Sequence, residues 1–96
     1  MTIEKNVCEN AAVMKLSGWL DTHSAPELDA QIRALGEEIT ALTLDFEKLE
    51  YISSAGLRLI VAAYKKMNGA LTLCHVSDEI MSVIRMTGLD KRITIA

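Results

Sequence analysis

The chain has 96 residues, of which 50% are hydrophobic and 24% are charged, and its formal net charge is -3 at pH 7. A chain of this length can bury one hydrophobic core but not two, so we expect a single domain spanning residues 1–96, and the composition excludes a disordered chain. The absence of net positive charge argues against nucleic acid as a direct partner.

The N-terminal residues predict a β-hairpin. Residues 2–7 and 11–16 are short strand candidates separated by a polar turn. In the second candidate the apolar residues Ala12, Met14 and Leu16 lie at alternate positions, as in a strand with one buried face. We therefore expect an antiparallel hairpin at one edge of a sheet.

A first helix is predicted to begin after Ser24. Ser24 and Glu27 form the S-x-x-E pattern of a capping box, and Pro26 suits the first turn of a helix. Apolar residues then recur at helical spacing and predict the buried face of this helix: Leu28, Ile32, Leu35 and Ile39.

The middle of the chain predicts a strand followed by a second helix. Residues 42–46 form a short apolar run that is typical of a buried strand. The helix is predicted to begin at Ser54, with Ser53 as its N-cap, and to end near Asn68 and Gly69, which favour a helix stop.

The last third of the chain predicts a strand, a third helix and a short final strand. Residues 71–76 have the strand pattern, and Ser77 is placed to cap the helix that follows. Gly88 suits a left-handed helix stop, and Ile93 and Ile95 predict the final strand.

Strands that alternate with helices indicate an α/β fold. We expect a mixed sheet of four to five strands, with parallel central strands, an antiparallel N-terminal edge hairpin and three main helices. The methionines at strand and helix positions are interpreted as core filling: Met14, Met67, Met81 and Met86.

The cysteines and the N-terminus give little sign of special chemistry. Cys8 and Cys74 lack C-x-x-C spacing and are interpreted as reduced thiols. Strand alternation would place Cys74 and His75 on opposite faces, so we expect them to share no metal ion. We also expect no cofactor. The N-terminus lacks a signal-peptide pattern, and no apolar stretch reaches the ~18 residues that would span a bilayer. We therefore expect a cytoplasmic protein.

The predicted start of the second helix is the main candidate site. Ser54 would be its first residue, exposed at the carboxyl end of a parallel strand, where a phosphate would meet the positive end of the helix dipole. Ala55 and Gly56 are small enough for a partner to approach the backbone closely. Arg58 lies one turn further on and is either a pairing group for that phosphate or a solvated surface charge.

A catalytic role for Ser54 is not supported. The G-x-S-x-G elbow of α/β hydrolases requires glycine two residues before the nucleophile, where this chain has Ile52. A triad with His23 and Asp21 would require the first loop to fold over the helix start. The chain also lacks the Gly-x4-Gly-Lys pattern of a nucleotide-binding loop, so we expect no enzyme.

Three segments in order resemble the STAS domain family, in particular the bacterial anti-sigma factor antagonists: KLSGWLDTHSAPEL, LDFEKLEYISSAGLRLIVAAYKKM and SVIRMTGLDKRITI. The resemblance implies a small mixed sheet with helices packed against it. It also implies a partner switch, in which the unmodified antagonist binds an anti-sigma factor serine kinase and so frees the sigma factor. The kinase phosphorylates a serine at the second helix start, which breaks the complex, and a serine phosphatase restores it.

Matched residue by residue, the resemblance places the phosphate acceptor at Ser54. Ser53, where many members carry Asp, is the alternative acceptor. Gly18 and Asp21 match a turn that the family uses in kinase contact, and Trp19 beside them is either an interface anchor or a cover for the core. The expected partner-binding residues are Trp19, Asp21, His23, Ser53, Ser54, Ala55, Gly56 and Arg58.

Two other functions remain open. One is a STAS regulatory subunit of a membrane transporter that works without phosphorylation, and the other is a sensor domain, which would need a cofactor pocket. The hydroxyl at Ser54 favours the switch over the transporter subunit, and the few aromatic residues argue against a sensor. We expect a monomer or a weak homodimer.

Overall fold

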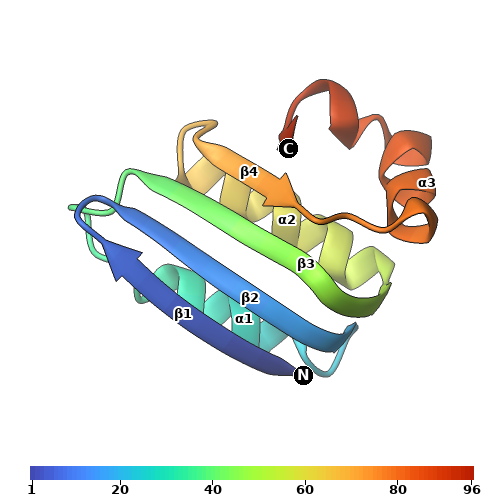
Figure 1. The fold of residues 1–96 in the computed structure, drawn as a ribbon, viewed down its shortest axis with the longest axis horizontal. Helices are drawn as coiled ribbons and strands as arrows, with labels where there is room; N and C mark the ends of the chain where they lie inside the picture. Colours follow the sequence, from blue (N-terminus) through green and yellow to red (C-terminus); the bar gives the residue numbers. More distant parts are fainter.

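A five-stranded sheet runs through the computed structural model, which describes residues 1–96 (Figure 1). The spatial order of the strands, β1-β2-β3-β4-β5, equals their order along the chain. β1 and β2 form the predicted antiparallel hairpin, and the remaining neighbours pair in parallel. The strands are β1 Thr2–Cys8, β2 Ala11–Leu20, β3 Ala41–Ile52, β4 Leu71–Cys74 and β5 Thr94–Ile95.

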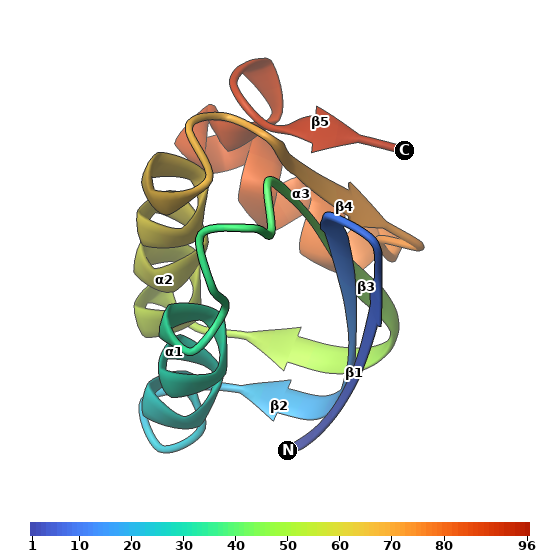
Figure 2. The same ribbon diagram turned by 90° about the vertical axis from the view of Figure 1, so that its left-hand side faces the viewer.

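Two helices cover one face of this sheet. α1 (Ala25–Arg33) follows β2 and α2 (Ser54–Lys66) follows β3, and both lie on the same side (Figure 2). α3 (Asp78–Thr87) lies beyond the carboxyl end of β4 and leads through a short 3-10 turn, Leu89–Lys91, into β5 (Figure 1). The opposite face of β1, β2 and β3 therefore carries no helix. The predicted single-domain α/β fold with three main helices is confirmed.

The core lies between the sheet and the helices α1 and α2. Alternate residues of β2 point into it, as predicted, and Ala12, Met14 and Leu16 are each at most 1% exposed. Leu28 on α1 and Ile60 on α2 belong to the same cluster of 22 buried hydrophobic residues. The period-two pattern of β2 thus sets which face the helices cover.

The predicted capping box at Ser24 is wrong. Ser24 has helical backbone angles and makes no cap to the first turn. Its hydroxyl donates to the Trp19 carbonyl oxygen at 2.6 Å and accepts the Asp21 N–H at 2.9 Å. The Glu27 N–H donates to the Ser24 carbonyl oxygen at 3.0 Å. Asp21 caps the turn that leads into α1, because its Oδ1 accepts from the backbone nitrogens of His23 (3.0 Å) and Ser24 (3.1 Å).

The first helix is also shorter than predicted. α1 ends at Arg33, yet Leu35 and Ile39 are still buried. They continue the apolar pattern from the connection to β3, where burial and not helical geometry sets their positions.

Three strands differ by more than one residue from the prediction, and β2 is one of them because it continues past residue 16 to Leu20. β3 extends to Ile52 because it pairs with β2 as far as Leu20. The pairing continues through two register shifts, between Lys15 and Ser17 and between Gly18 and Trp19. β4 ends at Cys74 and not at residue 76, because His75 has a left-handed backbone with φ 53°. This backbone angle breaks the strand.

The remaining helix ends agree with the prediction. Ser77 caps α3 by accepting the Ile80 N–H at 3.2 Å, and Gly88 ends it with φ 77°. The interpretation of the methionines holds for Met14 and Met67 but is wrong for Met86, which is 87% exposed on α3.

None of the helices combines the length and the hydropathy that a bilayer crossing requires.

Candidate functional site

Ser53 joins β3 to α2 and is held on all sides by hydrogen bonds. Its backbone is extended, its Oγ accepts the Gly56 N–H at 3.3 Å, and its carbonyl oxygen accepts the Leu57 N–H at 3.0 Å. Its own N–H donates to the Leu20 carbonyl oxygen at 2.9 Å. The bond to the Gly56 N–H confirms the predicted N-cap. Ser53 is half-buried, and its hydroxyl is already engaged.

Ser54 is the first residue of α2 and is exposed. None of the side-chain hydrogen bonds of the protein involves its hydroxyl, which therefore faces solvent without a partner. The first turn of α2 also contains no acidic residue. The positive end of the helix dipole is thus uncompensated at this place, which favours an added negative charge.

Gly56 corrects one expectation, because it faces the interior and not a partner. A Cβ at this position would lie 2.8 Å from Cγ1 of Ile52, 2.9 Å from Cγ of Leu20 and 3.0 Å from the Leu20 carbonyl oxygen. The missing side chain lets the start of α2 pack against the ends of β2 and β3. Ala55, its neighbour, is half-buried.

The loop between β2 and α1 is held by the Asp21 carboxylate, which accepts N–H groups of the loop. The Ser24 N–H, and with it the His23 N–H, keep the pKa of Asp21 below its ordinary value. Asp21 is half-buried, whereas the His23 side chain is exposed. Asp21 therefore shapes the loop and is not a free acid, and His23 offers an imidazole to an incoming molecule.

Strand pairing brings this loop next to the start of α2. Leu20 pairs with Ile52 at the carboxyl ends of β2 and β3, and the residues that follow are Asp21 and Ser53. Parallel strands end at the same edge of a sheet, which is where α/β folds place their sites. The sequence-predicted residues on the two loops are therefore neighbours, apart from the inward-facing Gly56.

An exposed aromatic pair lies on the same edge. Trp19 and Tyr51 are register partners, with ring centroids 5.2 Å apart and an angle of 46° between the ring planes. Trp19 is 57% exposed and Tyr51 is 46% exposed, so Trp19 does not cover the core. Tyr51 was not predicted from the sequence. It could have been noticed as an aromatic residue among polar neighbours near the end of a predicted strand. Such a pair offers a large, stiff contact area to a protein partner.

Arg58 lies on the α1-facing side of α2. It lines a shallow groove between these helices together with Ala55 and three residues of the first loop and α1: Thr22, Pro26 and Asp29. Arg58 is exposed and forms no ion pair, since Asp29 is already paired with Arg33 at 2.9 Å. The guanidinium is thus free one turn from Ser54.

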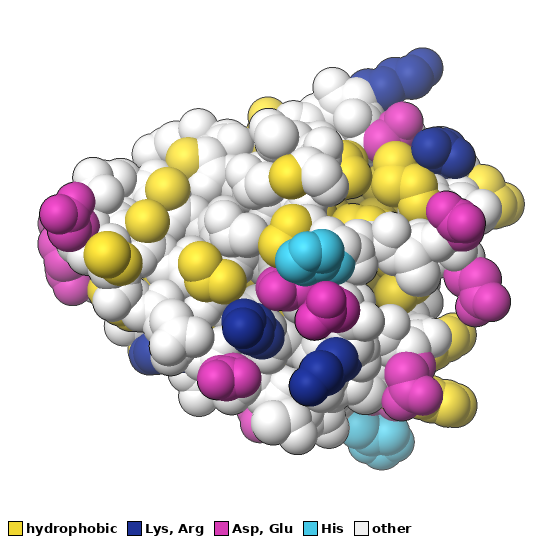
Figure 3. All heavy atoms as spheres, viewed as in Figure 1, with side chains coloured by type: hydrophobic (Ala, Val, Ile, Leu, Met, Phe, Trp, Pro, Cys, Tyr) yellow, Lys and Arg dark blue, Asp and Glu magenta, His cyan; other side chains and the backbone are white.

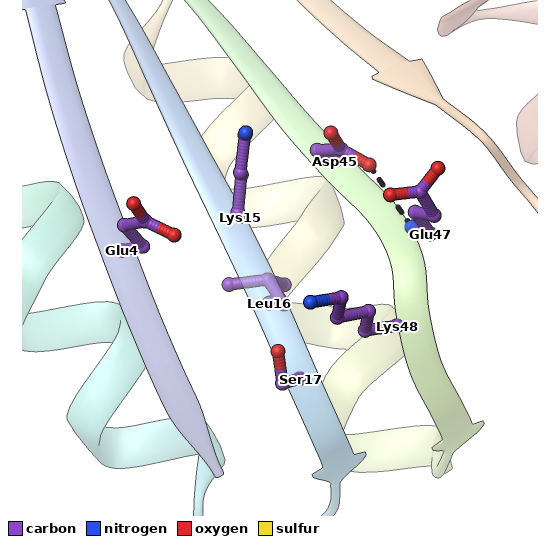
Figure 4. A pocket seen from close by; sticks show the side chains of 7 residues that line it. All are labelled: Glu4, Lys15, Leu16, Ser17, Asp45, Glu47 and Lys48. Carbon is purple, nitrogen blue, oxygen red and sulfur yellow. Dashed lines mark hydrogen bonds between the residues drawn. The ribbon is translucent and has the colours of Figure 1, made fainter.

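The helix-free face carries a second group of polar residues. Charged side chains gather over its centre (Figure 3). A shallow hollow between β2 and β3 is lined by acidic residues and lysines in near balance, which gives no excess charge to hold an anion (Figure 4): Glu4, Lys15, Ser17, Asp45, Glu47 and Lys48.

Beside this hollow the structure contradicts one prediction, because Cys74 and His75 lie on the same face. The Nδ1 atom of His75 lies 2.9 Å from Oδ1 of Asp45, and the sulfur of Cys74 is close to both.

The contacts within this group change its pKa values. Burial would raise the pKa of Asp45, but the N–H of Glu47 and the His75 ring hold it below its ordinary value. The hydrogen bond to Asp45 raises the pKa of His75. Burial raises the pKa of the Cys74 thiol.

Known proteins are similar to this chain in sequence and in fold. The anti-sigma-B factor antagonist of Bacillus subtilis is 30% identical over 91 residues, covering 92% of this chain and 84% of that protein. The structure of the Bacillus cell fate determinant SpoIIAA in the phosphorylated form superposes with a TM-score of 0.77 at 22% identity, covering 99% of this chain and 91% of that one.

The fold also occurs in another class of protein. A sulfate transporter family protein from Wolinella succinogenes superposes with a TM-score of 0.77 at 16% identity, covering 94% of this chain and 80% of that one. The fold alone therefore does not separate the antagonist from the transporter subunit. The STAS domain model matches residues 2–96, and the chain belongs to the STAS domain family.

Proposed function

We propose that this protein is an anti-sigma factor antagonist whose binding to an anti-sigma factor serine kinase is switched off by phosphorylation of Ser54. The observation that carries the proposal is the exposed, unpartnered hydroxyl of Ser54 at the uncompensated start of α2. The curated relative that is 30% identical is named an anti-sigma-B factor antagonist, which supports the same role here.

The choice of Ser54 over Ser53 rests on their surroundings. A kinase needs the hydroxyl at the surface and in reach of its own base. Ser53 is half-buried and its hydroxyl accepts the Gly56 N–H, so modifying it would remove the cap of α2. Ser54 is exposed, and its hydroxyl is not needed by the fold.

The proposed contact surface consists of the two loops and the aromatic pair beside them. Trp19 and Tyr51 supply apolar area, and His23 and Arg58 supply polar groups near Ser54. The unmodified protein docks this surface on the kinase, which leaves the sigma factor free. The phosphatase that restores the complex must reach the same exposed position.

Phosphorylation changes binding without unfolding the protein. The Ser54 oxygen forms a bond to the γ-phosphorus of ATP while the bond to ADP breaks, and the hydroxyl proton passes to a base of the kinase. The product carries a charge of about -1.5 to -2, which the helix dipole stabilises. In a desolvated interface the same charge needs to cost only about 2.7 kcal/mol to weaken binding a hundredfold.

The test is phosphorylation of the purified protein by an extract of its source cells with ATP, followed by mass spectrometry of the peptides. We expect one phosphate on Ser54, none after Ser54→Ala, and the same yield after Ser53→Ala if that variant stays folded. A phosphate on Ser53 or elsewhere contradicts the choice of Ser54. No phosphate in extracts from any growth condition contradicts the switch and favours the transporter subunit.

A further inference from the structure

Three potential metal ligands of different chemistry converge on the helix-free face. One ligand atom each from Asp45, Cys74 and His75 lies within 4.8 Å of the other two. Asp45 and Cys74 are register partners on the adjacent parallel strands β3 and β4, which places their side chains on the same side of the sheet. Asp45 is buried, Cys74 is half-buried and His75 is exposed, so the group opens to solvent at one side.

The backbone at His75 is what completes the group. Regular strand alternation would send His75 to the face opposite Cys74. Its left-handed angle, φ 53°, turns the imidazole back, so that Nδ1 lies 2.9 Å from Oδ1 of Asp45. This conformation costs free energy for a residue with a side chain, least for Asn, Asp and His, and glycine adopts it freely. The sequence has histidine here, a residue that binds metals.

We propose that Asp45, Cys74 and His75 form a site for a zinc-class divalent cation. Thiolate, imidazole and carboxylate are the three donor types of protein zinc sites, and a thiolate disfavours magnesium and calcium. The charges also balance, because a carboxylate and a thiolate together neutralise a divalent cation and the imidazole binds as the neutral ring. The Cys74 thiol proton is released to solvent when the cation binds.

The dimensions fit a site that closes on its ion. Ligands of a tetrahedral zinc ion lie about 3.5 Å from one another. The present separations, from 2.9 Å for Asp45 and His75 up to at most 4.8 Å, therefore need to change by at most about 1.3 Å. The exposed His75 side chain can supply this movement. Asp45 Oδ1 already accepts the Glu47 N–H at 2.9 Å, and Oδ2 has no hydrogen bond and is available to the ion. The fourth position faces solvent.

The other charges around the group are Glu47, whose carboxylate adds to the negative potential, and Lys15, which opposes it. The site lies on the helix-free face, whereas Ser54 lies at the start of α2. A test of metal binding at this site therefore does not depend on whether the proposed phosphorylation switch is correct.

The test uses the untagged full chain, reduced and stripped of metals with a chelator. Titration with Co²⁺ is followed by optical absorption, and titration with Zn²⁺ by calorimetry. We expect one equivalent to bind, with a thiolate-to-cobalt charge-transfer band. Because losing an outer partner of a ligand already weakens metal binding about 10- to 100-fold, Cys74→Ser and His75→Gln should each weaken it by at least tenfold.

The sequence supplies matched controls, since it has only two cysteines and two histidines. Cys8→Ser and His23→Gln should leave the affinity unchanged. A second measurement needs no variant: Zn²⁺ should slow alkylation of Cys74 but not of Cys8 in the same molecule. Absence of the charge-transfer band, equal affinity of the Cys74 and Cys8 variants, or equal alkylation with and without Zn²⁺ overturns the proposal.

Discussion

α2 and α3 begin in nearly the same way but differ in charge. Each has an extended serine as N-cap, and the Ser53 and Ser77 hydroxyls accept the N–H group three residues ahead at 3.3 and 3.2 Å. The first turn of α3 then carries Asp78 and Glu79, whereas that of α2 carries no acid. Capping is therefore the structural requirement that the two helices share. The lack of an acidic residue beside the positive end of the helix dipole distinguishes α2, where the candidate site lies.

The largest effect is expected where the bare start of α2 is given a permanent charge. Ser54→Asp should weaken binding to the kinase that modifies the protein about a hundredfold, because an unpaired carboxylate is desolvated at the interface. Ser54→Ala should bind like the wild type and accept no phosphate. Calorimetry on the isolated pair measures both, and equal affinity of all three forms would rule out the switch.

The next effect tests the close packing of Gly56 at the start of α2. Gly56→Ala gains up to about 1 kcal/mol of helix propensity but overpacks the ends of β2 and β3, which typically costs about 1 to 3 kcal/mol. We expect a net loss of about 1 to 2 kcal/mol in urea unfolding. Gly36→Ala is the control, because the added methyl would meet only the flexible end of Glu38. A neutral Gly56→Ala would show that α2 can shift outward.

The shared caps should contribute equally. Ser53→Ala and Ser77→Ala each remove one side-chain acceptor from a helix start, at about 1 kcal/mol of unfolding free energy. Both values come from the same denaturant titrations. A much larger loss at Ser53 would mean that its hydroxyl does more than cap α2, and the choice of acceptor would have to be reconsidered.

Smaller effects of opposite sign are expected from charge alone. Ser54→Asp should raise the free energy of unfolding by about 0.3 to 1 kcal/mol, and Asp78→Ser should lower it by a similar amount, since acids near a helix N-terminus interact favourably with the dipole. Added salt should shrink both differences. If Ser54→Asp destabilises the fold instead, the phosphate would act partly by disturbing α2.

The smallest effect extends the comparison to the start of α1, where Asp21 replaces the serine cap. The N–H of Ser24 is the main cause of its lowered pKa, so the carboxylate stabilises the folded state above its unfolded value near 3.8. This contribution should disappear as the pH falls below about 4 through the lowered folded-state pKa. The stability difference between wild type and Asp21→Asn should therefore narrow in acid, and a constant difference would contradict this role.

The features that follow from neighbours along the chain could be predicted from the sequence. Ser53, Ser77 and Gly88 act within one turn of their own positions, and all three were predicted correctly. The alternation in β2 also predicted which residues face the helices. Local preference and tertiary packing agree at these places.

The features that depend on distant contacts could not be predicted. The burial of Gly56 depends on how α2 meets Leu20, and the Ser24 hydroxyl does not cap α1 because it is bonded to the Trp19 carbonyl oxygen and the Asp21 N–H. Trp19 is exposed because a register shift brings it opposite Tyr51. The backbone angle of His75 has no reliable local signal, since few residues other than glycine adopt it, although histidine does so more often than most.

The agreement between strand order in space and along the chain affects synthesis of the protein. Each strand pairs only with the strands that precede and follow it in the chain. An early strand therefore needs no partner from a distant, later part of the chain. When Lys66 has left the exit tunnel, three strands and both covering helices are complete. We therefore expect the Ser54 region to be assembled on the nascent chain before the last third emerges from the tunnel.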